Sequence, residues 1–582
     1  MGYHGGGAAG PTHRLREEVS FDLGWSLIER FSQWARESGS ADEHRAADAI
    51  VRELAELGIG HEIHEPDLYL SLPRDSRVEA DGGALSFRAK PPSFSTSTGG
   101  GGLAAPLVYV PAAQARGGIG DIFEIAYDEA MPDVLGKIVL TEGYAMPLTV
   151  KRFETAGAVG QVYINPGENI HWGICTPIWG TPTEDNWPTR PHTPVVAVNR
   201  PAGEALRNRA SGETFEVTLH VDLEEGWYRC KIPVATIPGA TEEFVLVHGH
   251  YDSWDIGIGD NAVGDATLLE LARIFDAHRG ELRRTLKVAW WPGHSTGRYA
   301  GSTWFADRFA LDLRKHCVAA VNIDSPGCWH ATAYEDVMWM AEAAEHCRRS
   351  IRDATGQEAT GQRPLRAGDY SFNQLGLTSF FMLLSSIPSE ERERLGFYAT
   401  GGCGGNIAWH TEDDGMDVAD RGNLERDLDV YVTALAGVLD AEILPFDFRA
   451  TAGELGAALG DYQREAGELL DLSPALAELE DLRRELEGLY EGEHDAAAVN
   501  GVLKELSRIL VPLGYAEGER FEHDPALPRA PIPKLAGIRG LRTCAETRPD
   551  HLPFLQMGLK RRVNQVANAL YEAAETVRRI RS

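Results

Sequence analysis

Histidine and aspartate residues of the kind that bind metal ions follow an apolar segment near the middle of the chain. FVLVHGH leads directly into YDSWDIGIGDNAVGDATLLELAR, which places His250, Asp252 and Asp260 on a Gly-rich loop before a helical pattern. Imidazole and carboxylate are ordinary zinc ligands, and one carboxylate can bridge two ions. His250 and Asp260 are therefore candidate ligands, and Asp252 is a candidate for orienting His250. A solvated acidic turn beside a partly buried histidine would also fit this segment taken alone.

Two later segments carry more residues of the same types. CVAAVNIDSPG ends an apolar run at Asp324, and WHTEDDGMD places Trp409 and His410 among acidic residues. A lone carboxylate after a strand is often a helix cap, which would be a structural role. Four ligand-type residues at strand ends or loops nevertheless favour a metal site made of His250, Asp260, Asp324 and His410.

The segments around these residues predict the fold that brings them together. From residue 243 the chain alternates strand-like and helix-like stretches: FVLVHGH, TLLELARIFDA, TLKVAWW, TWFADRFAL and CVAAVNIDS. This alternation predicts an α/β protein with a doubly wound sheet, whose sites lie at the carboxyl ends of the strands. The candidate ligands all fall at such ends.

The remaining sequence predicts two further units. Residues 100–225 alternate short Val/Ile-rich runs with Gly/Pro turns, which indicates a β-rich insert. Residues 446–582 hold long helical patterns and predict a helical domain. The expected domains are 1–99 (helices and the start of the α/β domain), 100–225 (insert), 226–445 (α/β domain) and 446–582 (helical domain).

The charge and hydropathy of the chain argue against two classes of partner, nucleic acids and membranes. Lys+Arg 56 against Asp+Glu 87 gives a net charge of -31, which would repel a polyphosphate and excludes nucleic acid as an expected partner. No apolar run approaches the roughly 20 residues that span a bilayer, so no membrane partner is expected. The seven cysteines form no CxxC pair, and the first residues show no secretion pattern, so a cytoplasmic protein with a small-molecule or peptide substrate is expected.

Three segments carry a family resemblance. HGHYDSWDIGIGDNAVG, VNIDSPG and WHTEDDGMD resemble the ligand segments of the co-catalytic zinc aminopeptidases and carboxypeptidases, the family of glutamate carboxypeptidase II and the transferrin receptor. The resemblance implies that His250 and Asp324 hold one zinc ion, Asp260 bridges, and His410 helps to hold a second ion. It also gives Asp252 a catalytic supporting role beside His250. One or two Zn²⁺ ions per chain are expected, and another divalent metal fits as well.

The resemblance continues outside the ligand segments. GKIVL followed by KRFETAGAVGQVYIN is similar to the protease-associated domain of the same family. ILVPLGYAEGERFEHDPALPRAPIPKLAGI resembles its helical dimerisation domain. The chain is therefore expected to form a homodimer.

One departure from the family concerns the catalytic residues. The family has a Glu-Glu pair after the next strand, as general base and metal ligand, whereas RRTLKVAWWPGHSTGRYAGSTWFAD places His294 and Ser295 there. The family also has a Gly-Ser pair after the Glu-Glu pair, and Gly301 and Ser302 match it here. Counting back from them indicates one extra residue in this loop, which would place His294 at the position of the metal ligand. An imidazole is able to act as a metal ligand or as a general base, so His294 is a candidate for either role. A purely structural hydrogen bond in a site that has lost its function is the remaining interpretation.

Substrate contacts are expected from Lys534, Arg298 and Trp409. By resemblance Lys534 matches a lysine that binds the substrate glutamate in glutamate carboxypeptidase II, whereas Leu535 and Met146 stand where that relative has polar groups. A substrate with a C-terminal glutamate is therefore not expected. Lys534 and Arg298 would also fit solvated or surface-paired roles.

The sequence thus favours a metal-dependent hydrolase of a small peptide or amide-like C–N bond that uses a metal-activated water. Two alternatives stay open. One is a catalytically inactive binding scaffold like the transferrin receptor, and the other is altered metal chemistry on a non-peptide substrate, indicated by the segment around His294.

Overall fold

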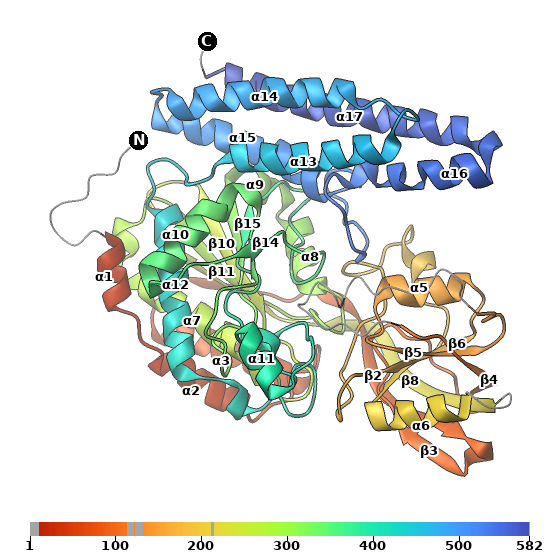
Figure 1. The fold of residues 1–582 in the computed structure, drawn as a ribbon. Coiled ribbons are helices and arrows are strands. Elements are labelled where there is room, and N and C mark those ends of the chain that lie inside the picture. Colours follow the sequence, from red (N-terminus) through yellow and green to blue (C-terminus); the bar gives the residue numbers. More distant parts are fainter. Residues whose placement is uncertain (1–10, 113–121, 123–131, 211–214, 581–582) are drawn as a thin grey trace.

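The computed structural model describes residues 11–112, 122, 132–210 and 215–580. Figure 1 shows an α/β unit, a β-rich unit beside it, and a layer of long C-terminal helices across both. None of the described helices has a run long and apolar enough to cross a membrane. All seven cysteines are buried and unpaired, as the scattered spacing predicted.

The α/β unit is built on a six-stranded sheet with the order β1-β9-β11-β10-β12-β15. Its strands are β1 (His61–His64), β9 (Ile232–Ile237), β10 (Phe244–His250), β11 (Thr285–Trp291), β12 (Cys317–Asn322) and β15 (Ser379–Phe380). β10 runs parallel to both β11 and β12, and β9 pairs with β11 in the antiparallel sense. Every residue of β10 is buried, including His250 at its carboxyl end.

Helices cover both faces of this sheet, which confirms the predicted doubly wound α/β architecture. They are α1 (Pro11–Glu17), α2 (Asp22–Phe31), α3 (Ala41–Glu56), α7 (Val263–Ala277), α8 (Ala300–Arg308), α9 (Ala310–His316), α10 (Ala344–Thr355), α11 (Ser389–Leu395) and α12 (Arg421–Leu439). The helices α1, α2 and α3 lie in residues 1–99, where the sequence predicted helices. Ser40 caps α3 by accepting a hydrogen bond from the Glu43 N–H. Leu268, Leu271 and Phe275 of α7 are fully buried in the main core of the unit.

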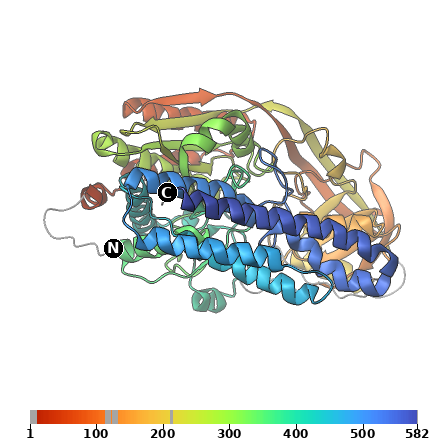
Figure 2. The ribbon, with the colours of Figure 1, turned by 90° about the horizontal axis from the view of Figure 1, so that it is seen from above.

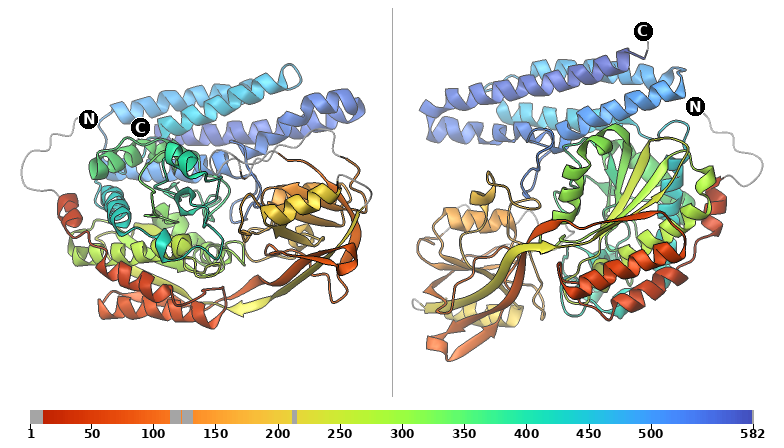
Figure 3. Two further views of the ribbon diagram at one scale, coloured as in Figure 1. Left: turned by 60° about the horizontal axis from the view of Figure 1, so that its bottom comes forward. Right: turned by 180° about the vertical axis from the view of Figure 1, so that it is seen from behind.

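The β-rich unit is a seven-stranded sheet with the order β3-β2-β8-β4-β5-β6-β7. Its elements are β2 (Asp67–Ala80), β3 (Leu85–Arg88), β4 (Leu103–Tyr109), β5 (Ile138–Glu142), α5 (Pro147–Thr155), β6 (Gly160–Ile164), β7 (Val195–Val198), α6 (Arg200–Ala210) and β8 (Phe215–Arg229). The expected boundary at residue 100 lies inside this unit, because β2 and β3 belong to its sheet. β2 carries Pro73, Arg74 and Asp75 in its middle, so no apolar run marks it in the sequence. β2 and β8 form a long antiparallel ribbon that joins this unit to the α/β unit (Figure 3).

Five α-helices form the C-terminal layer: α13 (Phe448–Ala466), α14 (Ser473–Glu491), α15 (Ala496–Tyr515), α16 (Leu541–Thr547) and α17 (Leu552–Arg578). α17 packs along α14 and α15. Figure 2 shows these helices lying across the other two units. A two-stranded pair, β13 (Val337–Met338) and β14 (Gly361–Gln362), completes the described strands.

Candidate metal and substrate site

The candidate ligands meet at one edge of the central sheet. β10 ends at His250, β11 is followed by His294, and β12 is followed by Asp324. Because these three strands are parallel, their carboxyl ends lie at the same edge and bring the three side chains together. His410 reaches them from the Gly-rich loop before α12. The structure therefore places every predicted metal ligand in one cluster.

Asp260 lies between two imidazoles. Its Oδ1 is 3.0 Å from His250 Nε2, and its Oδ2 is 3.0 Å from His410 Nε2. The other nitrogen of each ring faces a backbone carbonyl: His250 Nδ1 lies 3.0 Å from the Asp252 oxygen and His410 Nδ1 lies 2.9 Å from the Trp172 oxygen. Each imidazole therefore presents Nε2 to the Asp260 carboxylate, with one carboxylate oxygen per ring.

His294 joins this cluster rather than pointing away from it. Its ring stacks on the His250 ring with centroids 3.8 Å apart and planes 18° from parallel. One nitrogen or oxygen atom from each of His250, His294 and Asp324 lies within 4.8 Å of the others. Zinc is commonly bound by such a set of two imidazoles and a carboxylate.

A chain of buried hydrogen bonds fixes the His294 ring. His294 Nδ1 donates to Asp369 Oδ2 at 2.8 Å, and Ser302 Oγ donates to Asp369 Oδ1 at 2.6 Å. Ser302 Oγ also lies 2.8 Å from Ser371 Oγ, which accepts a hydrogen bond from Trp179 Nε1 at 3.0 Å. Although burial opposes ionisation, the neighbouring His294 lowers the pKa of Asp369, so this carboxylate is an acceptor. With Nδ1 committed to Asp369, Nε2 is the atom that His294 offers to the cluster.

Asp252 supports two of the ligands from behind. It is fully buried and accepts hydrogen bonds from Ser38 Oγ at 2.8 Å and from the backbone N–H groups of His294 and Ser295, both at 3.2 Å. Its Oδ1 also lies 3.5 Å from His250 Nδ1. Asp252 therefore orients His250 and pins the turn that carries His294.

The charges of the site favour a bound cation. Burial and the adjacent Asp260 raise the pKa of Asp324 to about 6. Although burial opposes charge on both groups, the imidazoles hold the pKa of Asp260 well below its usual range, and the carboxylates raise the pKa of His250. A proton on His250 thus offsets part of the carboxylate charge. A divalent ion would replace this proton, as metal binding to histidine sites does.

The donor geometry also fits an ion. His250 Nε2 and Asp260 Oδ1 are buried and 3.0 Å apart, yet neither makes an aligned hydrogen bond with any residue that the structure describes. Two ligands of one tetrahedral zinc ion, each about 2.0–2.1 Å from it, lie about 3.3 Å apart. The residues present are therefore suited to hold zinc.

Comparison with known proteins agrees with this geometry. Residues 233–434 match the family model described as Peptidase family M28. The chain carries an M28 peptidase domain. The resemblance to the co-catalytic zinc peptidases is thereby confirmed, and the matched range contains all of the predicted metal ligands.

Two aminopeptidases of known structure share the fold of the M28 domain and its surroundings. An aminopeptidase from Aneurinibacillus sp. strain AM-1 superposes with a TM-score of 0.53 at 19% identity, over 73% of this chain and 95% of that chain. The zinc aminopeptidase from Bacillus subtilis gives a TM-score of 0.53 at 19% identity, over 73% of this chain and 96% of that chain. At this identity the likeness concerns the fold alone.

Curated relatives match a shorter stretch. Over 120 residues the chain is 29% identical to a Caenorhabditis briggsae protein named Glutamate carboxypeptidase 2 homolog and 28% identical to its Caenorhabditis elegans counterpart. The match covers 20% of this chain and 15% of each relative's length. A match this short does not assign the activity of those proteins to this chain.

Three residues that the sequence did not single out hold the ligand loops of the M28 domain in place. The Asn261 side chain donates to the Ile323 oxygen at 2.9 Å and accepts from the Ser325 N–H at 2.9 Å. Asp414 accepts from the backbone N–H of Asp260 at 3.0 Å, and burial raises the pKa of Asp414 to about 7. Asp414 stands beside two other aspartates in HTEDDGMD, so only its burial distinguishes it.

The third residue is Arg36, which is fully buried. Its guanidinium donates to the backbone oxygens of Tyr251, Ile256 and Gly257 at 2.7–2.8 Å. These carbonyls belong to the loop between His250 and Asp260, so Arg36 fixes the path between two ligands. Nothing in the segment WARESGS signals this contact, because it spans more than 200 residues of sequence.

A small pocket of about 90 Å³ opens onto the ligands of the M28 domain. Trp409 and Arg298, two of the predicted substrate contacts, line it, and the Trp409 ring stacks on His410 with centroids 3.8 Å apart. Met146 also lines it, whereas Leu535 is fully buried in the core. Lys534 is not among the lining residues, since its Nζ donates to the Glu517 backbone oxygen at 2.7 Å.

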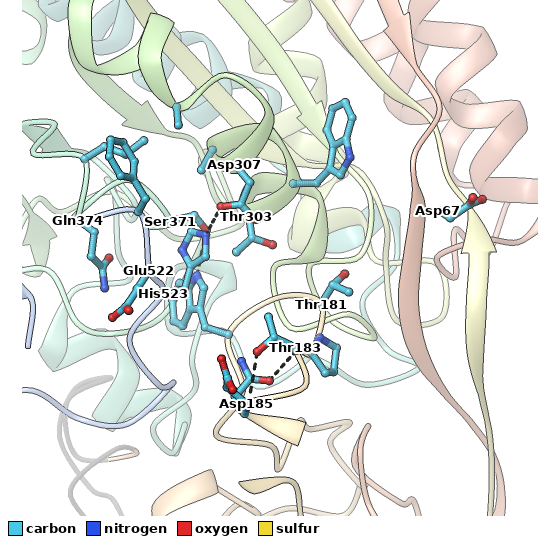
Figure 4. Close-up of a pocket in the computed structure, with 18 of the residues that line it drawn as sticks. Asp67, Thr181, Thr183, Asp185, Thr303, Asp307, Ser371, Gln374, Glu522 and His523 are labelled. Carbon is cyan, nitrogen blue, oxygen red and sulfur yellow. Dashed lines mark hydrogen bonds and ion pairs between the residues drawn. The ribbon is translucent and has the colours of Figure 1, made fainter. Parts of the chain in front are cut away.

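Figure 4 shows residues that line a second, larger cavity of about 1030 Å³. Trp179 and Ser371 line the large cavity, whereas Tyr299 lines the pocket at the metal ligands. The Trp179 and Tyr299 rings pack with centroids 4.1 Å apart and form a shared wall. The hydrogen-bond chain that fixes His294 therefore begins at the wall of the large cavity.

Proposed function

We propose that the chain is a zinc-dependent hydrolase of a small peptide or amide-like C–N bond. The observation that carries this proposal is the convergence of His250, His294, Asp324 and Asp260 in one cluster within an M28 domain. A pure scaffold would have no need for this cluster, because buried charged and polar groups without partners are costly.

The distribution of donors supports one tightly held ion per chain. His250, His294 and Asp324 offer three donors to one position. The second position of the co-catalytic family retains only His410 and Asp260 among the described residues, because a serine and a histidine stand where the Glu-Glu pair would be. Two donors hold zinc weakly, since stable protein sites use at least three.

A zinc ion bound there supplies Lewis-acid polarisation of a carbonyl and lowers the pKa of water. The protein's own part is proton handling. His410, which lines the pocket, has Nδ1 held by the Trp172 carbonyl, so Nε2 is the nitrogen left to take up a proton. Asp260 Oδ2, 3.0 Å away, is placed to stabilise the resulting imidazolium.

Metal content and turnover together test this proposal. Purified protein is expected to contain about one zinc per chain by elemental analysis, to lose it to a chelator, and to regain hydrolysis of N-acyl amino acids and dipeptides when zinc is restored. About two zinc ions per chain would contradict the single-ion assignment. A metal-free protein without turnover on any amide would favour the scaffold alternative.

We further propose that the β-rich unit is a protease-associated-like insert and that the C-terminal helices form a homodimer. α17 exposes Phe554 at 77%, Met557 at 54% and Tyr571 at 47% of their surface, and exposed apolar groups of this size mark interfaces. Light scattering at micromolar concentration is expected to give twice the 63.6 kDa of the chain.

A double variant, Phe554→Glu with Met557→Glu, is expected to yield monomers. The matched control is Leu311→Glu, which changes an equally exposed apolar residue outside the helical layer and should remain dimeric. A monomeric wild-type protein would refute the dimer.

A further inference from the structure

The pocket at the metal ligands contains a buried arginine. Arg298 is only 5% exposed and lines the pocket together with Asp324 and Asp260. Its backbone is in the left-handed region at φ 49°, and its carbonyl oxygen accepts a hydrogen bond from the Gly180 N–H at 2.6 Å. Residues other than glycine rarely adopt this backbone conformation, and residues with such backbone strain are common at functional sites.

The Arg298 guanidinium has no anionic partner among the described residues. Within the part of the chain that the structure describes, its Nε and Nη2 atoms are buried without a hydrogen-bond partner, and the guanidinium forms no ion pair. Its nearest aromatic neighbour is Tyr299, whose ring centroid is 4.9 Å from the guanidinium carbon. An uncompensated buried charge is expensive, so a protein that keeps one commonly pairs it with a ligand.

The charges around the pocket determine which ligand fits. Among the described residues, the carboxylates that line it are Asp260 and Asp324, and both are engaged with the histidine cluster. An ammonium group that entered the pocket would be repelled by the Arg298 cation, and neither carboxylate would be free to pair with it. A carboxylate would instead find the planar, multidentate donor set that a guanidinium offers.

The other walls restrict the rest of the ligand. Apart from the ligands and Arg298, the pocket is lined mainly by apolar side chains, among them Met146, Ile174, Met382, Leu383 and Trp409. A second carboxylate would lie against these walls without a partner. The cavity of about 90 Å³ has room for a small group, because one water occupies about 30 Å³.

We propose that Arg298 binds the carboxylate of the substrate, so that the pocket accepts a small N-acyl amino acid with one free carboxylate and an apolar side chain. This inference rests on the proposed hydrolysis for its reaction. In that reaction water forms a new C–O bond to the acyl carbon, the C–N bond breaks, and a proton passes to the leaving amine. N-acetylvaline would give acetate and valine.

Kinetics on a matched pair of substrates tests the inference. Wild-type protein is expected to have a kcat/KM at least about 30-fold higher for N-acetylvaline than for N-acetylvalinamide, because an unpaired buried charge is left when the carboxylate is missing. Arg298→Leu is expected to remove this preference by lowering kcat/KM for the acid alone. Arg308→Leu is the control, since this exposed arginine is the last residue of α8, the helix that begins two residues after Arg298.

A binding experiment separates this inference from the proposed reaction. N-acetylvaline is titrated into metal-free protein while tryptophan fluorescence is followed, because Trp172 and Trp409 line the pocket. Saturable binding of the acid, absent for the amide and lost in Arg298→Leu, would support the inference even if no amide is hydrolysed. Binding that requires zinc and persists in Arg298→Leu would overturn it, since the carboxylate would then contact the metal.

Folding of the variants is checked separately. Arg298→Asn is a second variant, because asparagine tolerates the left-handed backbone that leucine resists. Its thermal unfolding midpoint is compared with that of wild type and Arg308→Leu. A folded Arg298→Asn protein that still prefers the acid over the amide would refute the role of Arg298.

Discussion

Alanine in place of His294 is expected to lower zinc affinity on the order of 100-fold or more. The Nδ1 atom of His294 is committed to Asp369, so Nε2 is the donor that the cluster loses. Even outer hydrogen-bond partners of ligands change metal affinity by about 10- to 100-fold, so a ligand itself should exceed that range. The measurement is zinc competition against a chromophoric chelator, with elemental analysis of the purified variant.

Two further variants identify the role of His294. Asp369→Asn is expected to weaken zinc by about 10- to 100-fold, because it releases the ring without removing the donor. His278→Ala, at the far end of α7, is the control and should leave affinity unchanged. If His294→Ala retained zinc at wild-type affinity and lost only turnover, His294 would be a general base instead of a ligand. Unchanged metal and unchanged turnover would leave it a structural residue.

Strand ends explain why so much of this site was predictable. His250, Asp324 and His294 each follow an apolar run that the sequence identifies as a strand. Parallel strands bring their carboxyl ends to one edge, so three distant segments had to meet there. The α/β fold class follows from the same alternation of strands and helices, and the structure confirms it.

Contacts made across the fold were not predictable in the same way. Arg36 binds three carbonyls of a loop more than 200 residues away, and no local pattern records that pairing. The stacking of His294 on His250 depends on the register of one turn, which the sequence left uncertain by one residue. Lys534 matched a relative by position, yet it bonds to the Glu517 backbone.

The replacement of the Glu-Glu pair and the presence of the buried Arg298 change the charge of the pocket in the same direction. The two acidic side chains that the resemblance to the co-catalytic family leads one to expect are absent from this turn, which instead carries the imidazole of His294 and the guanidinium of Arg298 within five residues. Asp252, Asp260 and Asp324 remain to balance the ion. The pocket thereby becomes less negative on the side where a substrate carboxylate would approach.

Replacement of Asp260 by asparagine is expected to separate metal binding from catalysis. The amide keeps the shape of the side chain and the backbone bond to Asp414, but it removes the charge that faces both His250 and His410. Loss of one preorganised electrostatic group lowers kcat by about 100- to 1000-fold in other hydrolases, and a similar fall in kcat/KM is expected here.

The zinc content of Asp260→Asn decides between one ion and two. If His250, His294 and Asp324 hold a single ion, the variant should keep close to one zinc per chain while turnover falls. If Asp260 instead bridges two ions, its replacement should release zinc together with activity, because both positions lose a donor. Asp417→Asn, an exposed aspartate near the His410 loop, is the matched control and should keep both zinc and turnover. An Asp260→Asn protein with wild-type turnover would contradict either arrangement, since both make this carboxylate part of the reacting site.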